Sequence, residues 1–197
     1  MFKKVMNIII FALIFALYFV SFLMIFDSFK ERKLASLEKN AIDVFDKEVK
    51  IDEKKPEETK TSSSVSYSGF TILGKISIPK IGFNSVIIKE NTYKAMNVGI
   101  VLSYGDAINV EGGYVLSGHN FRGQNVFFYN IRNLKPGDIV QITDTSGVRL
   151  DYTVYETLRN VDPTETSYLN DFDGYHVTLV TCENGGKARI VVKARVN

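Results

Sequence analysis

The stretch TLVTCENGGKARIVV, residues 178–192, places the only cysteine of the chain at the end of an apolar run, seven positions before an arginine. The β-branched residues on both sides of ENGGKA are typical of two strands, and the Gly-Gly pair favours a hairpin loop between them. If Cys182 lies opposite Arg189, both side chains project from one face, whereas a slip of one residue would separate them. The stretch therefore predicts a β-hairpin, in which one of the two registers would place a thiol beside a guanidinium.

The residues around Cys182 leave two interpretations open. A lone cysteine at the end of an apolar strand is more often an inert core residue than a reactive one. A nucleophilic cysteine needs a base, because an ordinary thiol is only about 3% thiolate at neutral pH. Acyl transfer also develops negative charge on the attacked carbonyl oxygen, and a fixed guanidinium stabilises that charge.

The chain has two histidines, and they differ in their ability to serve as this base. His176 lies six residues before Cys182 on the same expected strand, about 20 Å away, so it cannot reach the sulfur. His119 follows a strand-like run in YVLSGHN, residues 114–120. Strand ends and loops commonly display reactive groups, so His119 is the candidate base.

The C-terminal part of the chain shows a period of two with turn signals at short intervals, which predicts a small, closed all-β domain. Segments 91–97 and 124–133 lack this alternation and are candidates for short helices. LKPGD and DTSG are typical turn sequences. The expected strands are 71–78, 84–88, 113–117, 138–143, 148–158, 175–182 and 188–196.

The N-terminal part contains 19 residues without a charge, Ile8 to Phe26, which would span roughly 28 Å as a helix and match a bilayer core. We interpret this segment as an uncleaved transmembrane helix, because the charged DSFKERK follows it in place of a small-x-small cleavage site; a signal peptide is the alternative. Lys3 and Lys4 on one side balance three basic residues on the other, so the positive-inside rule leaves the orientation open.

The region between this segment and the β-domain divides into two. Residues 28–50 carry an apolar stripe at helical spacing, formed by Leu34, Leu37, Ala41, Val44 and Phe45, which predicts a stalk helix. Residues 52–69 are charged and rich in serine and threonine, which predicts a mobile tether. The expected organisation is an anchor at 1–26, a stalk and tether at 27–69, and a folded domain at 70–197.

The composition excludes several classes of protein. A hydrophobic content of 45% is too high for a disordered chain, and one cysteine excludes an internal disulfide. The expected domain, 70–197, carries 13 basic and 12 acidic residues, which gives no footprint for nucleic acid. The histidines have no cluster of further ligands beside them, so the sequence does not indicate a zinc site.

The TLVTC block with an arginine on the next strand and SGHN upstream resembles the sortase family of Gram-positive cell-surface transpeptidases. The resemblance extends from Phe70 to the C-terminus. Three further stretches agree with it: ISIPKIGFNSVI (76–87), FYNIRNLKPGDIV (128–140) and VDPTETSYL (161–169).

The resemblance implies a closed eight-stranded β-barrel with short helices, in which Cys182, His119 and Arg189 are the catalytic cysteine, histidine and arginine. It also implies cleavage of a Leu-Pro-x-Thr-Gly-like signal on surface proteins after the threonine, and transfer of the acyl group to a cell-wall peptide amine. Thr181 is expected to orient the substrate and the oxyanion. The substrate loop, about 159–174, is expected to shape the pocket; Val161, Pro163 and Leu169 are candidates for its apolar lining.

The resemblance further implies a single-pass protein of the plasma membrane with its N-terminus inside and its catalytic domain outside. The anchor and the short loop before Arg189 are similar to class A or class B sortases rather than to pilin-polymerising ones. Some class A members bind calcium near the substrate loop. We interpret the acidic residues there as solvated carboxylates and expect no metal or other cofactor; they are Asp162, Glu165, Asp171 and Asp173.

Two other functions remain to be compared with this one. A peptidoglycan-acting cysteine peptidase or L,D-transpeptidase usually has a histidine two residues before its cysteine, where this chain has Val180. A noncatalytic extracellular binding module on the same barrel would have no need for Cys182, His119 and Arg189 together.

Overall fold

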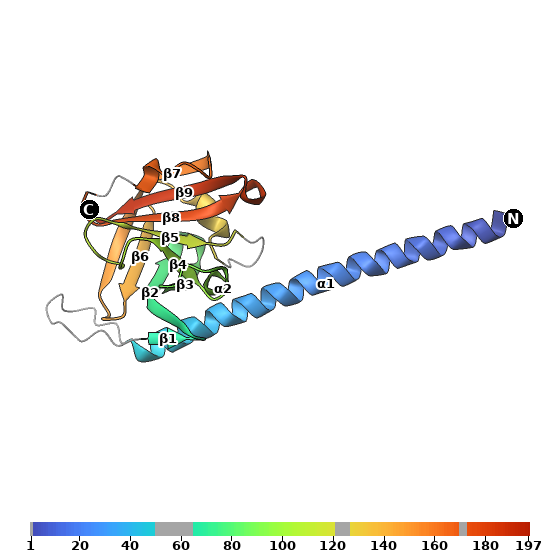
Figure 1. Cartoon of the computed structure of the whole chain (residues 1–197), viewed down its shortest axis with the longest axis horizontal. Coiled ribbons are helices and arrows are strands. Elements are labelled where there is room, and N and C mark those ends of the chain that lie inside the picture. Colours follow the sequence, from blue (N-terminus) through green and yellow to red (C-terminus); the bar gives the residue numbers. More distant parts are fainter. Residues whose placement is uncertain (1, 50–64, 121–126, 170–172) are drawn as a thin grey trace. The chain divides into compact units, whose positions relative to one another are not determined.

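The computed structural model describes residues 2–49, 65–120, 127–169 and 173–197. These residues form two units, one up to Ser36 and the other from Leu37 to the C-terminus (Figure 1). Helix α1, Phe2–Glu48, contributes to both units. The predicted tether lies mostly outside the described residues.

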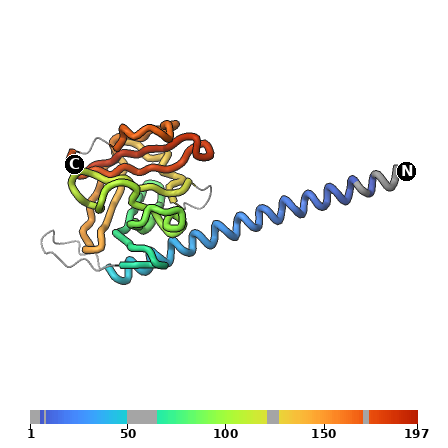
Figure 2. The backbone as a smooth tube through the Cα atoms, viewed as in Figure 1, coloured from blue at the N-terminus to red at the C-terminus, as the bar shows by residue number. Residues whose placement is uncertain are grey.

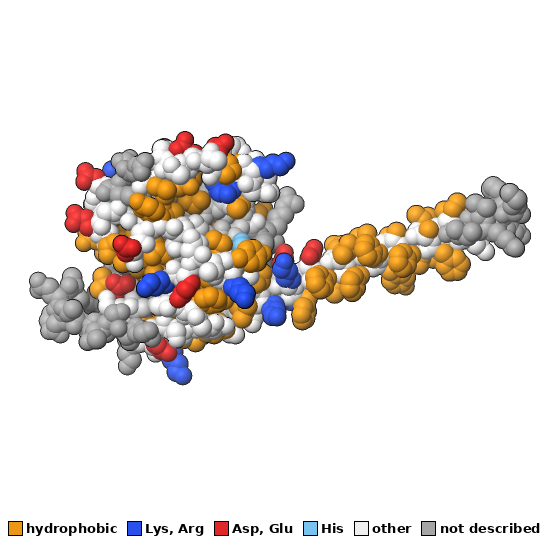
Figure 3. Space-filling view, in the orientation of Figure 1, with side chains coloured by type: hydrophobic (Ala, Val, Ile, Leu, Met, Phe, Trp, Pro, Cys, Tyr) orange, Lys and Arg blue, Asp and Glu red, His pale blue; other side chains and the backbone are white. Residues whose placement is uncertain are grey.

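The first unit is helical throughout its described part. Its apolar side chains are exposed along the helix, as Figure 3 shows, with Phe11, Phe15 and Tyr18 more than 70% accessible. Among the described residues, α1 is the one helix long and apolar enough to cross a bilayer. It fits a single-pass membrane anchor by its length and apolar composition.

The second unit is built on a closed β-barrel. Nine strands in the described residues pair in the order β1-β2-β3-β4-β5-β8-β9-β7-β6, and β6 pairs again with β2 to close eight of them into a barrel. The strands are β1 Val65–Tyr67, β2 Phe70–Ile78, β3 Phe83–Ile88, β4 Ile100–Tyr104, β5 Tyr114–Gly118, β6 Ile139–Asp144, β7 Arg149–Val161, β8 His176–Glu183 and β9 Ala188–Arg195. The predicted eight-stranded barrel is confirmed.

Short helices connect some of these strands. They are α2 Tyr93–Met96 and the 3-10 helices η1 Pro79–Ile81, η2 Tyr129–Asn133, η3 Ser167–Leu169 and η4 Asn184–Gly186. Helix α2 confirms the short helix expected in 91–97, where Thr92 caps it by accepting a hydrogen bond from the Ala95 amide. The described part of 124–133 contains η2, and residues 121–126 lie outside the description.

Each of the seven predicted strands is present, but β4 was not predicted. Its sequence, IVLSY, is a short apolar run without alternation, because β4 pairs with β3 on one side and β5 on the other and its first three residues are buried. Gly99 is the residue before β4. A Cβ at this position would lie 2.7 Å from the Val86 carbonyl oxygen, so the close approach of β3 requires a glycine.

The folded unit begins earlier than the expected boundary at Phe70. Strand β1 lies inside the segment predicted to be a tether. It pairs with β2, and its first residue, Val65, is fully buried. The end of α1 also belongs to this unit: Ala41 and Phe45 are buried in one cluster with Ile72 and Val86 of the barrel. The last part of the predicted apolar stripe, Ala41, Val44 and Phe45, is therefore part of the domain core, because it covers barrel side chains that water would otherwise contact.

Candidate active site

Cys182 and Arg189 are paired residues of the β8–β9 hairpin. The ladder runs from His176 opposite Arg195 to Glu183 opposite Ala188, without a register shift. Directly opposed residues of an antiparallel pair project from the same face, so the thiol and the guanidinium are neighbours. The turn at η4 uses positive φ angles at Gly185 and Gly186, which glycine adopts without strain. Cys182 is exposed.

The guanidinium of Arg189 is held by the same hairpin. Its Nη1 donates to the carbonyl oxygens of Gly186, at 2.9 Å, and Ala188, at 3.0 Å. A guanidinium carries five N–H donors, so this anchoring engages only one of its nitrogens. Arg189 also acts on Tyr168 of η3: burial raises the pKa of the Tyr168 hydroxyl, and the positive charge of Arg189 opposes that shift.

His119 reaches the same end of the barrel through a different strand pair. Strand β5 runs parallel to β8, and their last paired residues are Gly118 and Thr181. The next residues along the two strands are His119 and Cys182. Figure 2 shows these two segments, far apart in sequence, running side by side. The parallel register thus places the backbone of His119 beside that of Cys182, and their roles as base and nucleophile stay a prediction.

The surroundings of His119 are aromatic. Its ring lies 5.1 Å from the ring of Tyr93 and 5.7 Å from that of Phe127, in edge-on geometry. The backbone carbonyl of His119 accepts a hydrogen bond from the Phe128 amide at 3.0 Å. Gly118 allows this close packing, because a Cβ there would lie 2.5 Å from Ile100 Cδ1 and 3.1 Å from the Phe128 ring.

Thr181 lies in the ladder between β8 and β5. Its side chain is buried, and its hydroxyl donates to the Gly118 carbonyl at 2.7 Å. Successive side chains of a strand point to opposite faces, so Thr181 faces away from the side that Cys182 occupies. The hydroxyl therefore holds β8 to β5, and the expected role of Thr181 in orienting the substrate stays a prediction.

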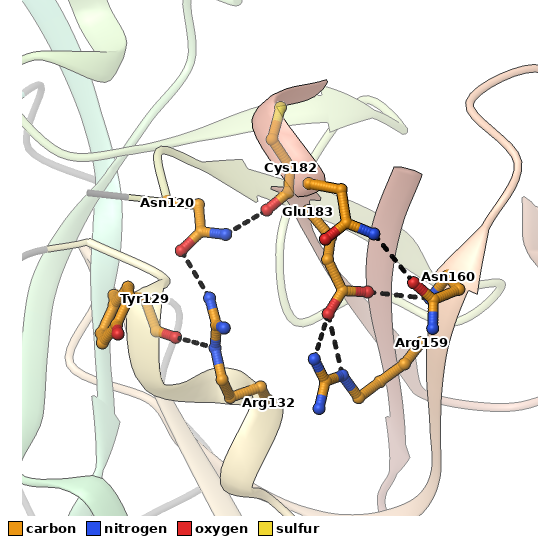
Figure 4. Close-up of polar contacts among 8 residues, drawn as sticks. Asn120, Tyr129, Arg132, Arg159, Asn160, Cys182 and Glu183 are labelled. Atoms are coloured by element: carbon orange, nitrogen blue, oxygen red, sulfur yellow. Dashed lines mark hydrogen bonds and ion pairs between the residues drawn. The ribbon is translucent and has the colours of Figure 1, made fainter. Parts of the chain in front are cut away.

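An asparagine and an arginine that the sequence did not single out lie beside Cys182 (Figure 4). Asn120 donates a hydrogen bond from Nδ2 to the Cys182 carbonyl oxygen, and its Oδ1 accepts one from Arg132 Nη2 at 2.8 Å. Arg132 Nε donates to the Tyr129 carbonyl at 2.9 Å, and its guanidinium lies 4.5 Å from the centre of the Tyr129 ring. These contacts link η2 to the backbone of Cys182.

The residue after Cys182 is fixed as well. Glu183 is buried and accepts hydrogen bonds from Arg159 and, at 2.8 Å, from the Asn160 amide. Burial by itself would raise the pKa of Glu183, but these hydrogen bonds and the charge of Arg159 outweigh it and lower the pKa. The pair ties the end of β7 to the end of β8, and Figure 4 shows it on the opposite side of Cys182 from Asn120.

An apolar cluster lies on the same face as the thiol. It contains Val180 of β8 and Val191 of β9, each two residues from Cys182 or Arg189 and so on the same side of its strand. Its half-buried members are Leu158, Val161, Tyr168 and Leu169. Val161 is also paired with Arg189 across β7 and β9. Two of the three predicted lining residues therefore lie together beside the site, whereas Pro163 is exposed and outside the cluster.

The family model described as "Sortase domain" matches residues 76–197, more than half of the chain. The chain is a member of the sortase family. The sequence of "Sortase A" from Listeria monocytogenes is 28% identical over 120 residues, and "Sortase A" from Bacillus anthracis is 29% identical over 111 residues. These matches cover 61% and 56% of this sortase but 53% and 52% of the relatives, so the chain spans about half the length of the curated relatives it matches.

Solved structures agree with this assignment. A Clostridium perfringens Sortase D5 transpeptidase superposes with a TM-score of 0.63 at 28% identity, covering 82% of this sortase and 99% of that chain. Sortase A of Listeria monocytogenes gives a TM-score of 0.59 at 26% identity, and the match covers 64% of this sortase and 87% of that chain. These relatives carry different class letters, so the expected class A or class B character of this sortase stays a prediction.

Two acidic residues of the sortase's β7–β8 loop, Asp162 and Glu165, accept hydrogen bonds from their own loop. Asp162 accepts hydrogen bonds from the amide and hydroxyl of Thr164, at 2.8 and 2.6 Å, and these bonds lower its pKa. Glu165 accepts one from the Ser167 amide at 2.7 Å. In the described part of the chain no group of three potential metal ligands is present; Asp171 lies outside that part. The expectation of no metal stays a prediction.

The second histidine lies at the other end of β8. His176 is paired with Arg195, is buried, and packs edge-on against the Tyr155 ring at 5.8 Å. Its separation from Cys182 follows the strand spacing used in the sequence prediction. His176 is therefore a packing residue of this sortase rather than a partner of the thiol.

Proposed function

We propose that this chain is a membrane-anchored cysteine transpeptidase that cleaves an LPXTG-like sorting signal after its threonine and passes the acyl group to a cell-wall peptide amine. The observation that carries the proposal is that Cys182 is paired with Arg189 across β8 and β9, while His119 directly follows β5, which runs parallel to β8. Membership of the sortase family supports it.

The chemistry assigns one task to each group. The Cys182 thiolate attacks the carbonyl carbon of the signal's threonine, and the electron pair of the C=O bond moves to oxygen. Arg189 stabilises this oxyanion through N–H groups that its hairpin does not engage. The oxyanion then collapses, the C–N bond to the next residue breaks, and His119 delivers a proton to the leaving amine. A thioester on Cys182 remains.

The second half of the reaction reverses these roles. The acceptor amine attacks the thioester carbon, His119 takes its proton, and the C–S bond breaks to restore the thiolate. The apolar cluster around Val161 and Leu169 suits the leucine and proline side chains of a sorting signal, since it lies on the face that carries the thiol. Surface proteins bearing the signal and a cell-wall precursor peptide are the proposed partners.

The proposed location is the plasma membrane, with a single span near the N-terminus and the catalytic domain outside the cell. The apolar part of α1 supports the span. The orientation follows from the proposed acceptor, because cell-wall peptides that receive surface proteins are exposed on the outer side of the membrane. Lys3 and Lys4 would then lie inside.

The test uses the full-length protein in detergent micelles with a quenched Leu-Pro-x-Thr-Gly peptide, with and without an amine nucleophile. We expect cleavage after the threonine, faster with the amine, and none in Cys182→Ala or His119→Ala. His176→Ala is the matched control, because this histidine lies at the far end of the strand that carries Cys182. Full activity of either site variant contradicts the mechanism.

Two further substrates separate the alternatives. Turnover of an Asn-Pro-type signal in place of the LPXTG peptide would change the class of signal and keep the mechanism. Turnover of a peptidoglycan stem peptide alone would favour an L,D-transpeptidase.

A further inference from the structure

The strand pairing that aligns His119 with Cys182 stops one residue before them. Gly118 and Thr181 are the last paired residues of β5 and β8, so His119 and Asn120 continue beyond the ladder. The Asn120 side chain crosses to β8 at this point and donates to the Cys182 carbonyl oxygen. A hydrogen bond from the residue after the histidine thus reaches the backbone of the cysteine.

The orientation of the Asn120 amide is determined by its two partners. The guanidinium of Arg132 can only donate hydrogen bonds, so the atom of Asn120 facing it must be the oxygen. The amide nitrogen then faces the Cys182 carbonyl, which can only accept. Figure 4 shows the thiol pointing away from this contact, so the hydrogen bond holds the cysteine backbone and leaves the sulfur accessible.

Arg132 is itself held from two sides within η2. Its Nε donates to the Tyr129 carbonyl at 2.9 Å, and its guanidinium lies over the Tyr129 ring. A planar guanidinium fixed in this way presents Nη2 to Asn120 in one direction. The contacts therefore form a continuous path from η2 through Arg132 and Asn120 to Cys182.

We propose that Asn120 and Arg132 are positioning residues that set the separation between the His119 imidazole and the Cys182 thiol. This inference rests on the proposed function for the reaction it serves. Because Asn120 is bonded covalently to His119 and through its side chain to Cys182, a displacement of the amide moves the base relative to the nucleophile. The barrel ladder is complete without this contact, so its loss affects the reaction geometry more than the fold.

The first experiment compares Asn120→Ala, Arg132→Ala and the double variant in full-length protein. A misplacement of reacting groups by about 1 Å costs up to about 100-fold in rate, so each single variant should lower kcat about 10- to 100-fold with little change in KM. If the two residues act through one path, the double variant should be no slower than the slower single variant. If the reductions in kcat of the two single variants multiply in the double variant, the two residues act independently and the proposal is overturned.

Three further variants separate positioning from charge and from general destabilisation. Arg132→Lys keeps the positive charge but loses the planar fork, so it should be slow; wild-type rates in this variant would overturn the proposal. Asn120→Asp keeps an acceptor for Arg132 but loses the donor to Cys182, and it should also be slow. Asn133→Ala, at an exposed position next to Arg132, is the matched control with the wild-type rate.

A second readout is independent of the peptide substrate. The rate of alkylation of Cys182 by iodoacetamide, measured across the pH range in which imidazole and thiol titrate, reports the coupling of the two groups. We expect Asn120→Ala to shift this pH profile and Asn133→Ala to leave it in place. If Asn120→Ala has the same pH profile as wild type, the positioning role of Asn120 and Arg132 is overturned. If Asn120→Ala shifts the profile but the wild-type protein does not cleave the LPXTG peptide, only the proposed substrate is contradicted.

Discussion

Cys182 and Arg189 face each other across the β8–β9 hairpin, and Arg189 is paired on its other side with Val161 of β7. Three adjacent strands thus present a thiol, a cation and an apolar side chain in one row. The hairpin carbonyls that hold Arg189 Nη1 restrict where the charge lies. A cation fixed in advance stabilises a developing oxyanion without reorganising during the reaction.

Replacing Arg189 should therefore affect the reaction more than substrate binding. Arg189→Ala should lower kcat by about 100- to 1,000-fold, the typical cost of removing one oxyanion-stabilising group. Arg189→Lys should fall between this variant and wild type, because it keeps the charge but loses the fork that reaches the hairpin carbonyls. Steady-state peptide cleavage measures both. Arg195→Ala, at the far end of the same strand, is the control; an unaltered kcat in Arg189→Ala would remove Arg189 from the mechanism.

The buried Thr181 hydroxyl should matter chiefly for stability. Thr181→Val keeps the shape of the side chain but leaves the Gly118 carbonyl without this donor, at a cost of about 1–3 kcal/mol in the free energy of unfolding. Thr181→Ser keeps the hydroxyl and should lose less. Urea denaturation followed by circular dichroism measures the difference. Equal stability of Thr181→Val and wild type would show that the hydrogen bond contributes nothing.

The end of α1 should stabilise the barrel. Phe45 is fully buried in the cluster with Ile72 and Val86, so Phe45→Ala should cost about 3–5 kcal/mol. Lys47→Ala, at an exposed position of the same helix, should cost little. Thermal unfolding of the full-length variants in detergent compares them. The expectation fails if both variants melt at the wild-type temperature.

Glu38 should make the stability of this helix contact depend on pH. Burial is the main cause that raises its pKa from 4.5 to about 7, and a hydrogen bond with Ser85 opposes the shift. Because the folded state binds the proton more tightly than the unfolded state, the stabilisation is full below pH 4.5 and is lost as the pH rises toward about 7. Hydrogen exchange of residues 37–49 should accelerate across this window in wild type and not in Glu38→Gln.

The single cysteine offers a test of membrane orientation. An impermeant maleimide added to intact cells should label Cys182 if the barrel lies outside, since the thiol is exposed. Cys182→Ala is the blank. Labelling only after the cells are permeabilised would place the domain inside and contradict the proposed location.

The sequence predicted much of the fold because alternation along an amphipathic strand is a local property. Seven strands of the barrel were identified in this way. Strand β4 was missed because it is short and apolar without alternation. Strand β1 was missed because Val65 lies in a serine-rich segment, where the local composition outweighs one buried side chain. Phe45 packs in one cluster with Ile72 and Val86, which are far from it in the sequence, so no local pattern could predict this contact.

What the sequence determined by itself was the hairpin around ENGGKA, because its two strands are neighbours in the chain; the register that sets Cys182 opposite Arg189 came from the structure. His119 was the candidate base because His176 is too far along the strand, and the parallel register of β5 and β8 puts the His119 backbone directly after the residue paired with Thr181. The Asn120–Arg132 contact and the Glu183–Arg159 pair were decided by the tertiary structure alone. The partners of these two pairs lie 12 and 24 residues apart in sequence, and such contacts form only when the barrel closes.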